Sequence, residues 1–195
     1  NVEIIHADIL SLILSLTKLS FPHLNDVKAY KVVANLPYYI SSPVIQKFLY
    51  GEFRPERMVL LLQKEVAQRI CAKPPRMSLL AVSVQYAADP KIVAFVKRGS
   101  FWPAPKVDSA ILRITPKKSV PPKKEVEEFF RVARAGFSNP RKQILGNLST
   151  GLRVERITME KILKDAGISF SRRAETLSVA EWASLATSCG NLSET

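Results

Sequence analysis

The chain has 195 residues, of which 47% are hydrophobic and 24% are charged, as in an ordinary globular protein of one or two domains. No apolar run approaches the roughly 18 residues that cross a bilayer, and the first residues lack the basic segment of a signal peptide. The formal net charge is +12, shared between residues 1–115 and 116–195, which indicates a polyanionic partner or simply a well-solvated basic surface. Cys71 and Cys189 stand alone and far apart, which is typical of a reducing cytoplasm and speaks against structural zinc.

Residues 2–8 predict a strand that ends at Asp8, followed by a crossover helix over residues 9–19 and a loop over 20–28. A carboxylate at a strand end is placed to accept a hydrogen bond from the adenine of a bound cofactor, and a helix N-cap is the alternative role. The chain starts without Met and contains no G-x-G-x-x-G turn, so we expect an N-terminal portion of the fold to be missing from it. His6 and His23 lack metal-ligand spacing, and no metal site is predicted.

A second predicted strand, residues 30–34, leads into Asn35, Leu36, Pro37 and Tyr38. In open α/β sheets, ligands bind at the carboxyl ends of the strands. The Asn35 side-chain oxygen and the carbonyl of Leu36 or Pro37 would accept the two N–H bonds of an exocyclic amine, which frees the nitrogen lone pair for attack. Tyr38 would cover one face of a planar base. For so short a motif, a strand-ending turn with an Asn cap is the structural alternative.

The next elements alternate between helix and strand. We predict a helix from residue 42, a buried strand over 57–63, a helix over 64–70 and a buried helix over 77–87. Residues 91–96 and 109–114 predict two edge strands that form an antiparallel pair. The helix over 64–70 leaves Lys64 and Arg69 available to an RNA backbone. These patterns predict an α/β fold.

The link between the two edge strands carries aromatic residues and two prolines that stiffen it. We expect Phe101 to cover the second face of the base, opposite Tyr38, with Lys106 near the phosphates. A hydrophobic plug under a rigid loop is the alternative, and Trp102 is the better candidate for that role.

A Pro/Lys-rich linker over residues 116–124 separates these elements from a C-terminal helical domain, residues 125–195. Helices are predicted at 124–136, 139–149, 158–166 and 178–188. Gly167 is the predicted C-cap of the third, and Ser178 with Glu181 forms a capping box for the fourth. The helices bring basic side chains between apolar positions, which as a set indicate a surface for an RNA backbone: Arg131, Arg134, Arg141, Lys142, Arg172 and Arg173.

Asn35-Leu36-Pro37-Tyr38 with the following Ile40-Ser41 resembles motif IV of the ribosomal RNA adenine N6,N6-dimethyltransferases, the family of KsgA/RsmA and Erm. Four further stretches agree with that family in order and spacing, at residues 60–70, 99–114, 137–148 and 173–182. The last two favour the small-subunit branch. The resemblance covers nearly the whole chain, apart from the family's N-terminal motif I portion.

The resemblance implies a Rossmann-like class I methyltransferase sheet over residues 1–115, N-terminally incomplete, and a small all-α domain that binds rRNA. It implies transfer of methyl groups from S-adenosylmethionine to N6 of two adjacent adenines near the 3′ end of small-subunit (16S) rRNA. Asp8 and Asn35 would contact the cofactor. The expected partner is the pre-30S particle, and we expect a cytoplasmic monomer without membrane or metal. The chain alone is expected to be inactive.

Three other functions stay open at this point. One is an Erm-type 23S rRNA methyltransferase, one is a non-catalytic RNA-binding protein of ribosome assembly, and one is a mitochondrial transcription factor derived from the fold. The chain also departs from the family at Tyr39, where Asn is common, and at residues 75–77, where the family often has a Tyr-Gly pair. The departure at Tyr39 bears on how a second methylation is accommodated, and the departure at residues 75–77 bears on the contribution of the loop after residue 71.

Overall fold

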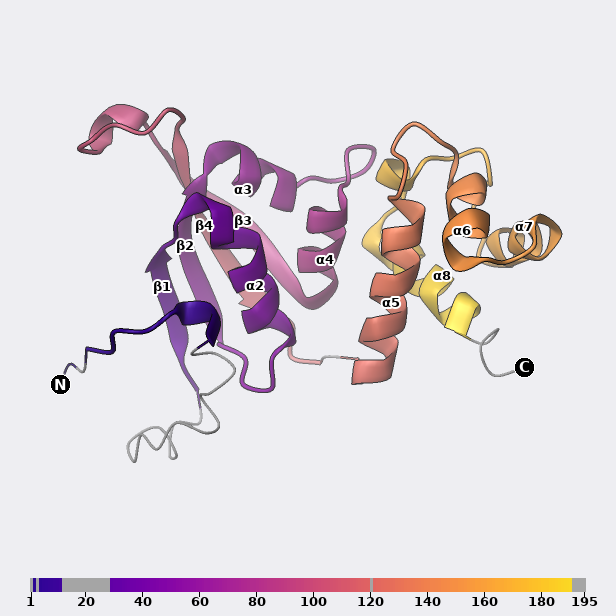
Figure 1. Ribbon diagram of the computed structural model, residues 1–195, viewed down its shortest axis with the longest axis horizontal. Helices are drawn as coiled ribbons and strands as arrows, with labels where there is room; N and C mark the ends of the chain where they lie inside the picture. The colour runs from indigo at the N-terminus through magenta and orange to yellow at the C-terminus, as the bar shows by residue number, and fades with distance from the viewer. Residues whose placement is uncertain (1, 3, 12–28, 120, 191–195) are drawn as a thin grey trace. The chain divides into compact units, whose positions relative to one another are not determined.

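The structure is a computed structural model that describes residues 2, 4–11, 29–119 and 121–190. It divides into two compact units (Figure 1). The sheet unit comprises Asn1–Ala67 and Ala87–Lys117, and the helical unit comprises Gln68–Tyr86 and Lys118–Thr195. None of the helices in the described ranges is long and apolar enough to cross a membrane.

The sheet unit contains a mixed four-stranded sheet in the order β1-β2-β4-β3. Its strands are β1 (Lys31–Asn35), β2 (Arg57–Gln63), β3 (Ala88–Val96) and β4 (Ser109–Pro116). β1 and β2 are parallel, whereas β4 runs antiparallel to both β2 and β3. The predicted antiparallel pair is therefore present, with β3 at the edge. The prediction that residues 109–114 also form an edge strand is wrong, because β4 pairs with β2 on one side and β3 on the other.

Burial alternates along the strands because one face of the sheet packs into the core. β2 buries Met58, Leu60 and Leu62, and the helix α2 (Ser41–Tyr50) buries Ile45 and Leu49 on the face of its helical period. Figure 1 shows α2 lying along the sheet. The connection from β1 to α2 is the short 3-10 helix η1 (Tyr38–Ile40), so the motif after Asn35 lies at the carboxyl end of a strand.

The expected strand over residues 2–8 is wrong for the residues that the structure describes there, which are irregular, and a helical turn begins at Ile9. A strand needs a neighbour to share its hydrogen bonds, and within the described sheet β1 pairs only with β2. The helical turn that follows is contacted by Lys47 of α2, whose ammonium donates to the Leu10 carbonyl. The remainder of the predicted helix over 9–19 and the loop over 20–28, including His23, lie outside the described residues.

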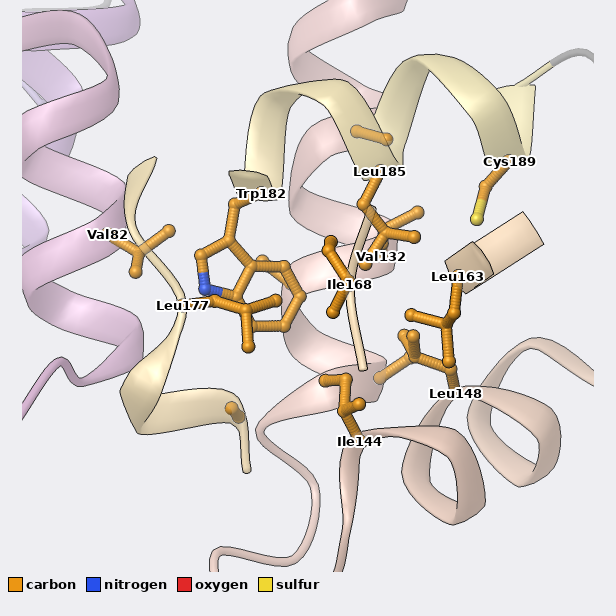
Figure 2. Packing of buried hydrophobic residues seen from close by; sticks show 14 of the residues in the cluster. Val82, Val132, Ile144, Leu148, Leu163, Ile168, Leu177, Trp182, Leu185 and Cys189 are labelled. Atoms are coloured by element: carbon orange, nitrogen blue, oxygen red, sulfur yellow. The ribbon is translucent and has the colours of Figure 1, made fainter. Parts of the chain in front are cut away.

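The helical unit packs around Trp182, whose side chain is completely buried. Figure 2 shows Val132, Ile168, Leu177 and other apolar side chains gathered around the indole. The helices are α3 (Lys64–Ile70), whose last residues belong to this unit, α4 (Leu79–Ala87), α5 (Lys123–Gly136), α6 (Ile144–Leu152), α7 (Arg156–Asp165) and α8 (Val179–Gly190).

The predicted helix ends are confirmed where their caps are chemically specific. Gly167 has a φ of +70°, and the Ile168 N–H reaches the Leu163 carbonyl at 2.8 Å, so α7 closes in a Schellman motif. Ser178 and Glu181 exchange hydrogen bonds as a capping box. In contrast, α6 begins at Ile144 and not at residue 139, because Asn139 accepts the Arg141 and Lys142 backbone N–H groups and forms a turn.

The domain limits expected from the sequence placed residues 68–86 with the sheet, whereas their contacts group them with the C-terminal helices. Val82 of α4 packs in the cluster around Trp182, and Tyr86 stacks on Phe129 with ring centroids 3.6 Å apart. The Gln85 amide donates to the Ile70 and Ala72 carbonyls, which fixes the loop after α3 to α4. Sequence order alone does not reveal that residues 68–86 pack with the C-terminal helices.

Candidate functional site

The first candidate site is the carboxyl end of β1. Asn35 is the last residue of the strand and is exposed, while Leu36 beside it is buried. The Pro37 carbonyl accepts the Ile40 N–H at 3.2 Å and the Ser41 hydroxyl at 3.3 Å. Because these two bonds occupy that carbonyl, the Leu36 carbonyl is the better candidate to act with Asn35 on an exocyclic amine. Of the two carbonyls that the sequence left open, Leu36 is therefore favoured over Pro37 as the partner of the Asn35 side-chain oxygen.

Tyr38 is half-buried, and its hydroxyl is 3.0 Å from the Ser109 Oγ. Ser109 is the first residue of β4, is completely buried and pairs with Gln63 of β2 and Val96 of β3. A hydroxyl held inside the sheet fixes the far end of the Tyr38 ring. The sequence analysis did not single out Ser109, although a serine that opens an otherwise apolar strand is a usable signal.

The loop between β3 and β4 is anchored at Asp108. The Asp108 carboxylate accepts the Arg98 backbone N–H at 3.1 Å, and its carbonyl accepts the Lys64 backbone N–H at 3.0 Å. The Lys64 ammonium lies 3.8 Å from the Asp108 carboxylate and 5.3 Å from the centre of the Phe95 ring. Lys64, predicted to bind RNA, thus has partners within the sheet unit that hold the base of the loop.

The aromatic residues of this loop differ in exposure. Phe101 is half-buried, and its backbone N–H closes a turn on the Arg98 carbonyl at 3.3 Å. Trp102 is 99% exposed, so its predicted role as a hydrophobic plug is wrong. Lys106 is exposed on the same loop. The neighbouring residues Asp108 and Ser109 connect Tyr38 with the loop that carries Phe101. Ser109 bonds to Tyr38, and Asp108 bonds to the loop at Arg98.

Asp8 acts as the cap of the turn that begins at Ile9. Its carboxylate accepts the Leu10 N–H at 2.9 Å and lies within 3.5 Å of the Ser11 hydroxyl. This is the capping role weighed in the sequence analysis. The side chain is exposed, so its remaining lone pairs are open to a ligand.

A second candidate site is the basic loop cluster of the helical unit, which we define as residues 72–77, 138–143 and 169–173. The Ile144 N–H donates to the Arg172 carbonyl at 2.7 Å, which joins two of the loops. The Met77 N–H donates to the Glu175 carbonyl at 2.9 Å and brings in the third. The exposed cations of the cluster are Lys73, Arg76, Arg141, Lys142 and Arg173.

A buried amide gives this cluster its shape. The Asn147 side chain donates to the Gly136 carbonyl at 2.7 Å and to the Asn139 carbonyl at 2.9 Å, which fixes the loop that presents Arg141 and Lys142. Lys73 and Arg76 were missed in the sequence analysis. They are distant in sequence, and only the packing of residues 68–86 into the helical unit brings them to the cluster.

Other predicted RNA-binding arginines have partners within the helical unit. Arg172 is half-buried and bonds to the Glu181 carboxylate and to Thr176. The hydrogen bond from Arg172, aided by hydrogen bonds from Ser178, lowers the pKa of Glu181 to about 2. Arg131 makes a two-pronged bond to Glu128 at 2.6 and 2.7 Å, which raises the pKa of the arginine. Arg69 is exposed.

Comparison with known proteins identifies the family. The model of the family "Ribosomal RNA adenine dimethylase" matches residues 1–187. The chain belongs to this family. Among curated adenine dimethylase relatives, the ribosomal RNA small subunit methyltransferase A of Dehalococcoides mccartyi strain CBDB1 is 43% identical over 188 residues, 95% of this chain and 62% of that protein. The protein of the same name from Geobacillus thermodenitrificans is 41% identical over 191 residues, 95% of this chain and 64% of that protein.

Two solved structures resemble this chain in fold. A dimethyladenosine transferase from Plasmodium falciparum matches with a TM-score of 0.69 and 26% identity, over 82% of this chain and 66% of that one. The 23S rRNA methyltransferase ErmE matches with a TM-score of 0.68 and 25% identity, over 96% of this chain and 72% of that one. The fold is thus a Rossmann-like methyltransferase sheet with a helical C-terminal part. The chain spans about three fifths of the length of the curated relatives.

Proposed function

We propose that this chain takes part in the N6,N6-dimethylation of two adjacent adenines near the 3′ end of small-subunit rRNA. The observation that carries the proposal is the end of β1, where exposed Asn35 stands beside the Leu36 carbonyl and Tyr38 is held by Ser109. The curated relatives named above are small-subunit methyltransferases, which supports this substrate over the 23S rRNA of the ErmE neighbour.

Asn35 and the Leu36 carbonyl would act on the target amino group. An aryl amine is a poor nucleophile because its lone pair is delocalised into the ring. Two acceptors that bind its two N–H groups favour a pyramidal nitrogen and direct the lone pair toward the methyl group. The in-line displacement leaves a cationic amine that loses its proton to water, so the chain needs no dedicated base. Orientation supplies most of the rate.

Tyr38 and Phe101 would hold the adenine after it leaves its stack. The Tyr38 hydroxyl is fixed by Ser109, and the turn that carries Phe101 is fixed through Arg98 and Asp108. Two rings fixed in this way lose little freedom when a base enters between them. The chain therefore contributes two preorganised stacking partners and two acceptors for the amino group.

S-adenosylmethionine supplies an electrophilic methyl group when bound. The described residues fit its adenine and methyl ends. The exposed Asp8 carboxylate has lone pairs left for an adenine amino group, and Asn35 stands at the strand end where the methyl would be transferred. We propose these two residues as cofactor contacts.

The basic loop cluster of the helical unit would bind the rRNA backbone in the pre-30S particle. Five exposed cations drawn from three loops offer contacts to several phosphates. Arg69 and Lys106 are further candidates because both are exposed, whereas Arg172 and Lys64 have structural partners. We propose a monomer that works in the cytoplasm.

The test is Asn35→Ala in the complete open reading frame that contains this chain, assayed with labelled S-adenosylmethionine on unmethylated small subunits. We expect methyl transfer to fall at least about a hundredfold, while rRNA affinity stays within a few-fold. Gln46→Ala is the matched control, because it removes an exposed amide from α2 without touching the strand end. Turnover retained by the Asn35 variant contradicts the proposal, as does an unsubstituted protein that binds subunits and transfers no methyl group.

A further inference from the structure

Trp102 has an unusual environment for a tryptophan. Its side chain is 99% exposed, whereas the other tryptophan of the chain, Trp182, is completely buried. An indole is the largest apolar side chain, and holding it in water forgoes the stabilisation that burial would bring. Tryptophan is enriched at binding interfaces, where its large ring supplies apolar contact area.

The loop that carries Trp102 is basic and well anchored. Lys97, Arg98 and Lys106 are exposed on it, and the Asp108 carboxylate at its base is bonded to the Arg98 backbone. The Ser100 N–H bonds to the Lys97 carbonyl at 2.9 Å and closes a 3-10 turn, η2 (Arg98–Ser100), just before the aromatic pair. Figure 1 shows the loop, in pink, extending beyond the ends of β3 and β4. The indole is therefore presented on a fixed backbone.

We propose that Trp102 stacks on an unpaired RNA base that neighbours the target adenine, while Lys97, Arg98 and Lys106 contact the flanking phosphates. The inference rests on the proposed function and extends it, because it concerns a second base and not the one that is methylated. The exposed cations on the same loop favour a polyanion over a protein partner. Stacking on a ring is tolerant of sequence, since every base has a π-face. Trp102 would thus hold the strand next to the flipped adenine.

The two tryptophans make the proposal directly measurable. Emission from buried Trp182 is shielded from acrylamide, so the quenchable signal reports Trp102. The chain is titrated with a single-stranded oligoadenylate and, separately, with double-stranded RNA of the same length. We expect the single strand to shield Trp102 from acrylamide and quench its emission, and the duplex to leave it accessible, because a paired base offers no free face.

Substitution provides the second measurement. Trp102→Ala should weaken binding of the single strand about 5- to 150-fold with an unchanged salt slope, because it removes a stacking partner and no charge. Trp102→Phe should recover most of the affinity. Ile157→Ala, which removes another exposed apolar side chain in α7, is the control and should bind as the unsubstituted chain does.

Two outcomes overturn the inference. If Trp102 is still quenched by acrylamide at saturating RNA, no base covers the ring. If the Trp102→Ala variant binds RNA with full affinity, the ring contributes no stacking contact. Shielding of Trp102 without RNA that rises with protein concentration would assign the ring to a second copy of the chain. If one of these outcomes is observed and Asn35→Ala still abolishes methyl transfer, the proposed role of Trp102 is wrong and the proposed function is unaffected. A chain that binds no RNA would remove both proposals.

Discussion

Reversing the charge of Arg141 and Lys142 tests whether the basic loop cluster binds the RNA backbone. Both side chains are exposed on a loop whose backbone is fixed by Asn139 and Asn147. The double variant Arg141→Glu and Lys142→Glu should therefore keep the fold while it removes two cations. Far-ultraviolet circular dichroism and urea unfolding check that the fold is kept.

The magnitude follows from counterion release. Each phosphate contact contributes about 0.7 to 0.9 to the slope of log affinity against log salt, so losing two contacts lowers the slope by about 1.4 to 1.8. Between 50 and 200 mM salt, the affinity of the unsubstituted chain should consequently fall about 7- to 12-fold more than that of the variant. The assay is filter binding or fluorescence anisotropy with small-subunit rRNA across a salt series.

The chain offers a matched control at the other end of α5. Lys123 and Lys124 open this helix, and Gly136 ends it next to the cluster, about 20 Å away at 1.5 Å per residue. Reversal of both lysines makes the same change in net charge, and glutamate is tolerated at a helix start. If this control flattens the salt dependence as much as the loop variant does, or if the loop variant keeps the original slope, the cluster is not the RNA surface.

Three further predictions concern single contacts. Tyr38→Phe and Ser109→Ala each remove the same 3.0 Å hydrogen bond, so each should lower the rate of methyl transfer about 2- to 10-fold without changing RNA affinity, and the double variant should be no worse than either alone; additive losses would disprove the link. Gly136→Ala would place a Cβ 2.3 Å from the Trp182 ring and should destabilise the helical unit by about 1–3 kcal/mol in urea unfolding, whereas Gly146→Ala has nothing within 4 Å and should be neutral or slightly stabilising; equal effects would contradict the packing. The pKa of Glu181 is lowered from its usual 4.5 to about 2, chiefly by the hydrogen bond from Arg172, so ionised Glu181 stabilises the fold above pH 4.5 and this contribution, about 1–3 kcal/mol, should disappear as the pH falls toward 2. The Glu181→Gln variant should unfold more easily at neutral pH, and its stability should no longer fall between pH 4.5 and 2 because of this group. If the variant loses stability in acid just as the unsubstituted chain does, the Arg172–Glu181 pair does not stabilise the fold.

Local chemistry made much of this fold readable in advance. The apolar runs that became β2 and α3 keep the boundaries expected from the sequence, because burial on one face imposes a strict period. The cap at Gly167 and the capping box of Ser178 and Glu181 depend on neighbouring residues only, so they could be recognised without a structure. The strand end at Asn35 is local in the same sense.

Contacts between distant segments could not be read in this way. The Ser109 hydroxyl meets Tyr38 across 71 residues, and the Arg172–Glu181 clamp turns a predicted RNA contact into a structural one. Nothing near Trp102 in the sequence distinguishes a buried indole from an exposed one, and the expectation of a plug was wrong. Burial is a property of what packs against a residue, which sequence order does not specify.

The sequence by itself determined that this chain is an α/β protein with a strand-end motif suited to an exocyclic amine, and that it carries a basic helical region. Periodicity, caps and motif spacing are encoded within a few residues, so they survive without tertiary context. Only the tertiary structure decided that the Ser109 hydroxyl meets Tyr38, that residues 68–86 join the helical unit, and which cations stand exposed in one cluster. Those outcomes depend on hydrogen bonds and packing between segments far apart in the chain, where many pairings are compatible with the same local pattern.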